Sequence, residues 1–122
     1  AESFFEAFDS GLSALLTDEW LAGSIATYQA GSPTTARIFV EQIRRSRGMS
    51  LEEMFQMELV IAYQCIRHPD FPEGVRALLV DKDKTPAWVY QSASEVPEEY
   101  LDEHFQPVWA GGHPLSDLTS AD

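Results

Sequence analysis

The middle of the chain, residues 50–88, carries the strongest local signals and predicts two helices joined at a sharp corner. Ser50 can accept from the backbone N–H three residues on, and the Glu53 side chain can reach back to the N–H of Ser50, which together form a capping box. Pro69 disfavours helical geometry in the residue before it, so the first helix should end there. Asp70 is a good N-cap for a second helix that follows at once.

Similar signals predict helices in the rest of the chain. Ser32 followed by Pro33 predicts a helix start, and Gly48 should close that helix. The other expected elements are a helix at residues 2–9 broken by Gly11, a short apolar segment at residues 12–16, a helix capped by Asp18 and closed by Gly31, and a last helix at residues 97–105.

These patterns predict an all-α fold, a compact bundle of five to six helices that occupies residues 1–109. The helix at residues 51–67 is apolar over much of its circumference, so it should be the central and most buried one. Gly, Pro and Ser are frequent in residues 110–122, which predicts a loosely ordered tail.

The charge and cysteine content exclude several kinds of partner. The net charge of −12, from 20 acidic and 8 basic residues, argues against nucleic acid, because its phosphates would be repelled. No apolar run approaches the length of a membrane span, and the first residues lack a basic-then-apolar signal pattern. The single cysteine, Cys65, cannot form an internal disulfide, which favours a cytoplasmic setting.

Three segments also carry a family resemblance, in the order SPTTARIFVEQIRR, SLEEMFQMELVIAYQC and DFPEGVRALLVDKDKTPAW. The last one resembles the C-terminal signature of the 3-hydroxyisobutyryl-CoA hydrolases, within the enoyl-CoA hydratase/isomerase (crotonase) superfamily. The resemblance covers residues 32–88, with looser similarity over residues 96–105. Members of that family are several times longer, and their catalytic half lies N-terminal to this region.

The resemblance implies that the chain is the C-terminal domain of an acyl-CoA thioester enzyme, one that hydrolyses 3-hydroxyisobutyryl-CoA in valine breakdown. In this family two backbone N–H groups stabilise the thioester oxyanion, and those groups lie upstream. The domain would cover the active site of the upstream catalytic domain, complete the CoA pocket and make subunit contacts in a homo-oligomer. CoA enters as part of the substrate, so no separate cofactor is expected, and the isolated chain should be inactive.

Two alternative functions are compatible with the same residues. The parent protein could be a hydratase or isomerase that acts on another acyl-CoA, because this region does not encode which bond breaks. The helical unit could also act mainly as an oligomerisation module.

The resemblance points to Lys82 as a contact for the CoA phosphates, with Lys84 behind it. The related hydratases place a phenylalanine where this chain has Leu78, so an aromatic contact to adenine is not expected here. The alternative is that the two lysines belong to a solvated charged segment. A second basic group, Arg44, Arg45 and Arg47, ends a helix and should mainly complement the helix dipole, with a CoA-facing or subunit-facing patch as the alternative.

Glu58 should be buried, since helical geometry groups it with Leu51 and Met54 on the apolar side of its helix. A buried carboxylate needs a cation or hydrogen-bond donors. Arg76 is the first expected partner in a structural ion pair, and Arg37 is the second. The alternative is that Glu58 supports the active site of the intact enzyme, although a lone carboxylate is a weak catalytic signal.

The rest of the sequence shows no other motif that is typical of a catalytic, phosphate-binding or metal site. His68, His104 and His113 lie far apart in sequence and lack the spacing of metal ligands, so no metal site is predicted. There is no Gly-rich phosphate loop and no nucleophile elbow.

Overall fold

The computed structural model describes residues 2–118, with side chains from Phe4 onward, and within that range the fold is all-α, with six α-helices and no strand. The fold class predicted from the sequence is therefore confirmed. The helices are α1 (Glu2–Leu15), α2 (Glu19–Ala30), α3 (Pro33–Ser46), α4 (Leu51–Arg67), α5 (Asp70–Val75) and α6 (Glu98–Glu103). A π-helical turn, η1 (Arg76–Val80), continues α5, and a 3₁₀ turn, η2 (Ala93–Glu95), precedes α6.

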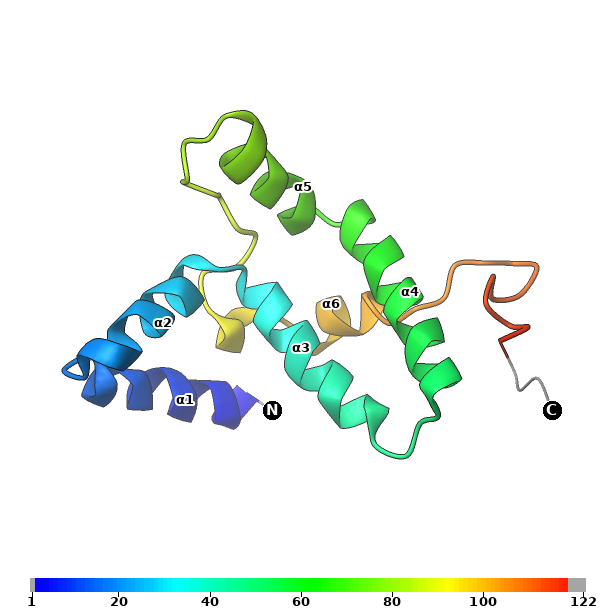
Figure 1. Ribbon diagram of the computed structural model, residues 1–122, viewed down its shortest axis with the longest axis horizontal. Helices are drawn as coiled ribbons and strands as arrows, with labels where there is room; N and C mark the ends of the chain where they lie inside the picture. Colours follow the sequence, from blue (N-terminus) through cyan, green and yellow to red (C-terminus); the bar gives the residue numbers. More distant parts are fainter. Residues whose placement is uncertain (1, 119–122) are drawn as a thin grey trace.

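The helices form an open arrangement in which α3 and α4 diverge from the loop that joins them (Figure 1). The pair α1 and α2 lies beside α3, and α5 extends away from the far end of α4 (Figure 1). The short helix α6 lies between α3 and α4 in this view, behind them (Figure 1). No described helix is long and apolar enough to cross a membrane.

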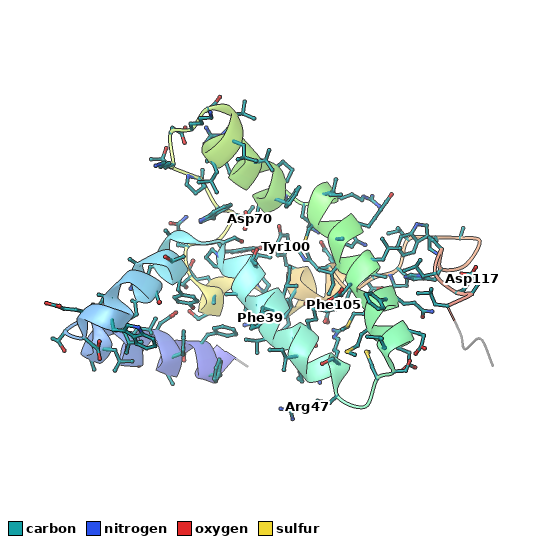
Figure 2. The ribbon with its side chains drawn as sticks, in the orientation of Figure 1. Phe39, Arg47, Asp70, Tyr100, Phe105 and Asp117 are labelled. Atoms are coloured by element: carbon teal, nitrogen blue, oxygen red, sulfur yellow. The ribbon has the colours of Figure 1, made fainter. Side chains whose placement is uncertain are left out.

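The main core lies where α3, α4 and α6 meet. It consists of Ile38, Ile61, Leu101 and Phe105, each nearly inaccessible to solvent. Figure 2 shows Phe105 between α3 and α4, and the Arg45 guanidinium lies over its ring at 4.1 Å. The other buried apolar residues come mainly from α1, α2 and the segment around η2, with one each from α4 and η1. They are Phe5, Leu12, Ile25, Val60, Ala77, Ala93 and Val96.

Three of the predicted helix starts are confirmed by their capping contacts. Both bonds of the Ser50 and Glu53 capping box are present. Asp18 accepts from the N–H groups of the first turn of α2. The Ser32 hydroxyl accepts from the N–H of Thr35 at the start of α3. These contacts join residues close in sequence, which is why local patterns were sufficient to predict them.

Two of the predicted local signals are wrong. Gly11 does not break the first helix, since α1 runs through it to Leu15; one glycine costs a helix only about 1 kcal/mol, which packing of the neighbouring residues offsets. Asp70 is not the N-cap of α5. Pro69 occupies that position without a side-chain cap, because the Asp70 carboxylate is engaged by other segments.

The prediction that α4 is the most buried helix is also wrong for this chain. Leu51 is 61% exposed and Phe55 is 49% exposed. The side chains that α4 buries are Val60, Ile61 and Gln64. The core contact of α4 runs through Ile61, which packs with residues of α3, α6 and the segment after α6. The side chains that α4 buries therefore lie on a different face from the one predicted by periodicity.

Residues 110–118 form turns that lie against α4. The Gln56 side chain donates to the Leu115 carbonyl at 2.9 Å, and a His113 ring N–H donates to the Gln56 carbonyl at 2.8 Å. Residues 119–122 of the expected tail lie outside the described residues. The boundary between a helical domain and a tail at residue 109 stays a prediction.

Candidate functional site

A large groove of about 1200 Å³ runs between the α1–α3 part of the chain and α5. Its walls are mainly apolar. On one side they include Phe4 and Phe8 of α1 and Phe39 of α3, and on the other side Phe71 and Leu79 from α5 and η1. These five side chains are all substantially exposed. The groove is therefore a large, mainly apolar concave surface on the described part of the chain.

The buried carboxylate of Asp70, which lines the groove, links segments of the chain by hydrogen bonds. Asp70, only 7% exposed, accepts from the Ser32 hydroxyl at 2.6 Å and from the Val89 N–H at 2.9 Å. Three segments that are remote in sequence are thereby tied together. Figure 2 shows Asp70 and Tyr100 in the region where α5 approaches the first turn of α3.

The rings of two histidines lie close together beside this carboxylate. The ring centroids of His68 and His104 lie 4.0 Å apart, and each ring also meets Tyr100 edge-on. One His68 nitrogen contacts the Gln64 carbonyl at 2.7 Å, and the other contacts a Glu103 carboxylate oxygen at 3.0 Å. Burial lowers the pKa of His104, whose Nδ1 contacts the Tyr100 carbonyl at 2.9 Å.

Arg76 organises the acidic loop that follows α5. Its guanidinium donates to Glu73 at 2.6 Å, to Asp81 at 2.8 Å and to Asp83 at 2.6 Å. The hydrogen bonds from Arg76 and from the Ala87 N–H lower the pKa of Glu73 to about 2. Arg76 hydrogen bonding likewise lowers the pKa of Asp83. The Arg76 guanidinium thus pairs with three acids, and these ion pairs hold the acidic loop against α5.

The two lysines proposed for phosphate contacts lie in this loop. Lys82 and Lys84 are both exposed, and neither forms an ion pair with a described residue. Each has a φ of 57°, a left-handed conformation that costs roughly 1–2 kcal/mol for a residue other than glycine. Lys84 lines the groove and its N–H donates to the Ala77 carbonyl at 3.0 Å. Their contact with CoA phosphates stays a prediction.

The predicted ion pair between Glu58 and Arg76 is wrong. Glu58 is exposed and its only described partner is the Gln42 amide, 3.3 Å away. Arg76 is engaged by Glu73 and two other acids that lie within seven residues of it. Partners close in sequence need little extra chain ordering, so they compete well against a carboxylate on another helix. Arg37, the second expected partner of Glu58, pairs with Glu98 instead.

The arginines of α3 are held by acids inside the chain. Arg37 is 1% exposed, pairs with Glu98 and lies 5.3 Å from the centre of the Phe5 ring. Arg45 pairs with Glu41 at 2.6 Å and with Asp102 at 2.7 Å, and Arg44 also pairs with Glu41. These pairs support a structural role for most of the basic residues in α3.

Sequence reasoning missed the polar cluster at the end of the groove. The spacing of His68 and His104 argued against a shared metal site, yet the approach of α6 to the end of α4 brings their rings together. Asp70 was expected to cap its own helix, so its hydrogen bonds with Ser32 and Val89 were not predicted. No local pattern could reveal these contacts, because each joins residues at least 19 positions apart.

Comparisons with known proteins agree with the sequence resemblance. Residues 2–105 match the family model described as Enoyl-CoA hydratase/isomerase. The chain is similar to three proteins named 3-hydroxyisobutyryl-CoA hydrolase, mitochondrial. They come from Gallus gallus (42% identical over 63% of this chain and 20% of the relative), Dictyostelium discoideum (35%, over 80% and 26%) and Homo sapiens (41%, over 63% and 20%). The chain therefore spans only a fifth to a quarter of the length of these relatives.

Proposed function

Because the chain belongs to the enoyl-CoA hydratase/isomerase family, we propose that it is the C-terminal helical domain of a CoA-thioester enzyme that hydrolyses 3-hydroxyisobutyryl-CoA in valine breakdown. The observation that carries the proposal is the 35–42% identity to hydrolases of that name. The short length of the match supports a domain rather than a complete enzyme.

The loop after α5 is the part of this chain proposed to meet the substrate. Arg76 engages the neighbouring acids Glu73, Asp81 and Asp83, which reduces their competition for the two lysines. The exposed ammonium groups of Lys82 and Lys84 can then bind CoA phosphates as compact positive charges. Their left-handed backbone supports a functional role, because strained conformations concentrate at binding sites.

The chemical step is proposed to take place outside this chain. Thioester hydrolysis needs preorganised donors for the developing oxyanion and a carboxylate that activates water. We assign both to the upstream catalytic domain, which this domain would cover. The substrate supplies the CoA, so the proposal includes no additional cofactor.

The test is to assay the intact parent protein with 3-hydroxyisobutyryl-CoA and to follow the release of free CoA with a thiol reagent. The proposal expects turnover by the intact protein and none above background by the isolated 122-residue chain. An intact protein that hydrates an enoyl-CoA without releasing free CoA would favour the hydratase alternative. Turnover by a preparation of the isolated chain that is free of the intact protein would contradict the assignment of catalysis to the upstream part.

Oligomerisation and location are further parts of the proposal. The exposed apolar groove supports subunit contacts, and an inactive parent protein whose assembly requires this domain would favour the oligomerisation alternative. The cytoplasmic location expected from Cys65 stays a prediction, since the relatives are named as mitochondrial proteins and a free thiol fits any reducing compartment.

A further inference from the structure

Two histidines close the junction between α4 and α6. His68 follows the last residue of α4, and His104 follows the last residue of α6. Their ring centroids lie 4.0 Å apart, and the ring planes are tilted by 35°. We call these two residues the histidine pair. The contacts of the four ring nitrogens indicate how many protons the pair carries.

The contacts of His68 fit a charged ring. Its Nδ1 lies 2.7 Å from the Gln64 carbonyl oxygen, and its Nε2 lies 3.0 Å from a carboxylate oxygen of Glu103. Both partners are acceptors. A neutral imidazole has one N–H and can donate to only one of them, whereas an imidazolium donates to both. A protonated His68 therefore links the C-terminal end of α4 to α6.

The contacts of His104 fit a neutral ring. The residue is 2% exposed, and its Nδ1 donates to the Tyr100 carbonyl at 2.9 Å. Among the described residues, its Nε2 has no hydrogen-bond partner. A proton added to Nε2 would leave a buried N–H without an acceptor, close to the charge on His68, and both effects are unfavourable.

Groups from three helices act on the charge of His104. Burial is the largest effect and lowers its pKa, and the nearby His68 on α4 lowers it further. Asp70 on α5 and Glu103 on α6 raise this pKa, as does the hydrogen bond to the Tyr100 carbonyl, but the pKa stays below 6.5. The other titratable groups on the elements that pack here are a partly buried thiol on α4, an arginine on α3 that is paired with Glu98, and a tyrosine that contacts Tyr100, namely Cys65, Arg37 and Tyr90.

The helix α6 depends on contacts of this kind. It has six residues and no side-chain N-cap, and a helix of this length is unstable in isolation. Its other contacts are the burial of Leu101 in the core and the ion pairs of Glu98 and Asp102 with arginines of α3. A short helix held by few contacts is the kind of element that opens locally when one contact is lost.

We propose that the histidine pair is an acid-sensitive contact, which holds α6 on the end of α4 while the pair carries one proton charge and releases α6 when a second proton binds. The proposal goes beyond the proposed function and does not rest on it. Packing lowers the pKa of His104, so the released state binds the second proton more strongly, and a fall in pH below about 6.5 favours release. Because His68 and His104 both line the groove, release of α6 changes the groove at this end.

The experiment measures hydrogen exchange of the intact protein by mass spectrometry at pH 7.5 and at pH 5.5. Protection is calculated for the peptide that contains α6 and, as an internal reference, for the peptide that contains α2, after correction for the exchange rate of an unfolded peptide at each pH. His104→Gln keeps a side-chain N–H for the Tyr100 carbonyl but does not titrate. His113→Gln is the matched control, because His113 contacts α4 through the Gln56 carbonyl and is not part of the pair.

The protection of α6 should fall about three- to tenfold on acidification, since one proton contributes at most about tenfold at one unit below the ordinary histidine pKa of about 6.5. The protection of α2 should change less than about twofold. His113→Gln should behave like the unmodified protein, whereas His104→Gln should lose less than about twofold at α6. No loss at α6 in the unmodified protein, or an equal loss in His104→Gln, would overturn the proposal, and the second result would assign the effect to the neighbouring carboxylates.

A second measurement decides the matter if His104→Gln fails to fold. Histidine labelled with carbon-13 at Cε1 is followed by NMR through a pH titration of the intact protein. The pKa of His104 should lie below 6.5 and should rise by about half a unit or more in His68→Gln, because a neighbouring charge has been removed. An unshifted His104 titration in His68→Gln would show that the two rings are not coupled and would overturn the proposal.

Discussion

The hydroxyl of Ser32 donates to the carboxylate of Asp70 at 2.6 Å, across 38 residues of sequence. The same oxygen accepts from the Thr35 N–H and so caps α3. One side chain therefore starts a helix and fixes the position of the next-but-one helix, α5, relative to it. Because Asp70 also accepts from the Val89 N–H, this carboxylate fixes where the loop that follows η1 returns to the bundle.

Replacing Asp70 with alanine should lower the free energy of unfolding by about 2–4 kcal/mol, because two part-buried hydrogen bonds to a charged acceptor are lost. Asp70→Asn should cost about 1–2 kcal/mol, since the amide oxygen can still accept from one donor. Urea denaturation of the isolated chain measures both values. Asp117→Ala is the control, because Asp117 is exposed and should change stability by less than about 0.5 kcal/mol. A loss at Asp70 no larger than at Asp117 would contradict the structural role.

The Arg76 cluster predicts a pH dependence at low pH. The pKa of Glu73 falls from 4.5 to about 2 on folding, so its contribution to stability is present above about pH 4.5 and is lost as the pH falls towards 2. In an Arg76→Gln variant the pKa of Glu73 should return most of the way to its ordinary value, as measured by NMR titration of the carboxyl carbon. Glu41 is an internal control, since Arg44 and Arg45 lower its pKa to about 2 and should continue to do so. An unchanged Glu73 titration would exclude Arg76 as the cause.

Glycine-to-alanine substitutions test the geometry of two helices. Gly11 lies inside α1, and an added Cβ would meet nothing within 4 Å. Gly11→Ala should therefore stabilise the chain by about 1 kcal/mol in thermal or urea denaturation. Gly74→Ala should give a smaller gain or a loss, because its Cβ would lie 3.3 Å from the Trp88 ring. If Gly11→Ala destabilised the chain, α1 would not continue through that position.

Removing the lysines of the loop should weaken substrate binding in the intact enzyme. The double variant Lys82→Ala and Lys84→Ala should raise KM for the acyl-CoA about tenfold with little change in kcat, because contacts to remote phosphates bind ground state and transition state alike. Arg47→Ala provides the comparison for the alternative basic patch at the C-terminal end of α3 and should leave KM unchanged. A rise in KM for Arg47→Ala alone would transfer the phosphate contact to that patch.

Most helix boundaries of this protein were predictable from its sequence, because they depend on contacts within a few residues. The capping box of Ser50 and Glu53, the Ser32 start and the Asp18 cap each join atoms less than two helical turns apart. The same holds for the all-α class, since helical spacing of apolar residues is itself a local property.

The tertiary structure alone decided which face of each helix is covered and which polar groups meet. Periodicity placed Glu58 on an apolar face, but α3 and α6 pack beside that face and leave Glu58 exposed. The hydrogen bond between Asp70 and Ser32 and the contact between the His68 and His104 rings depend on how α5 and α6 return to the bundle. Local sequence encodes the position of an apolar face along a helix. It does not encode the segment that covers that face, because burial depends on partners remote in the chain or outside it.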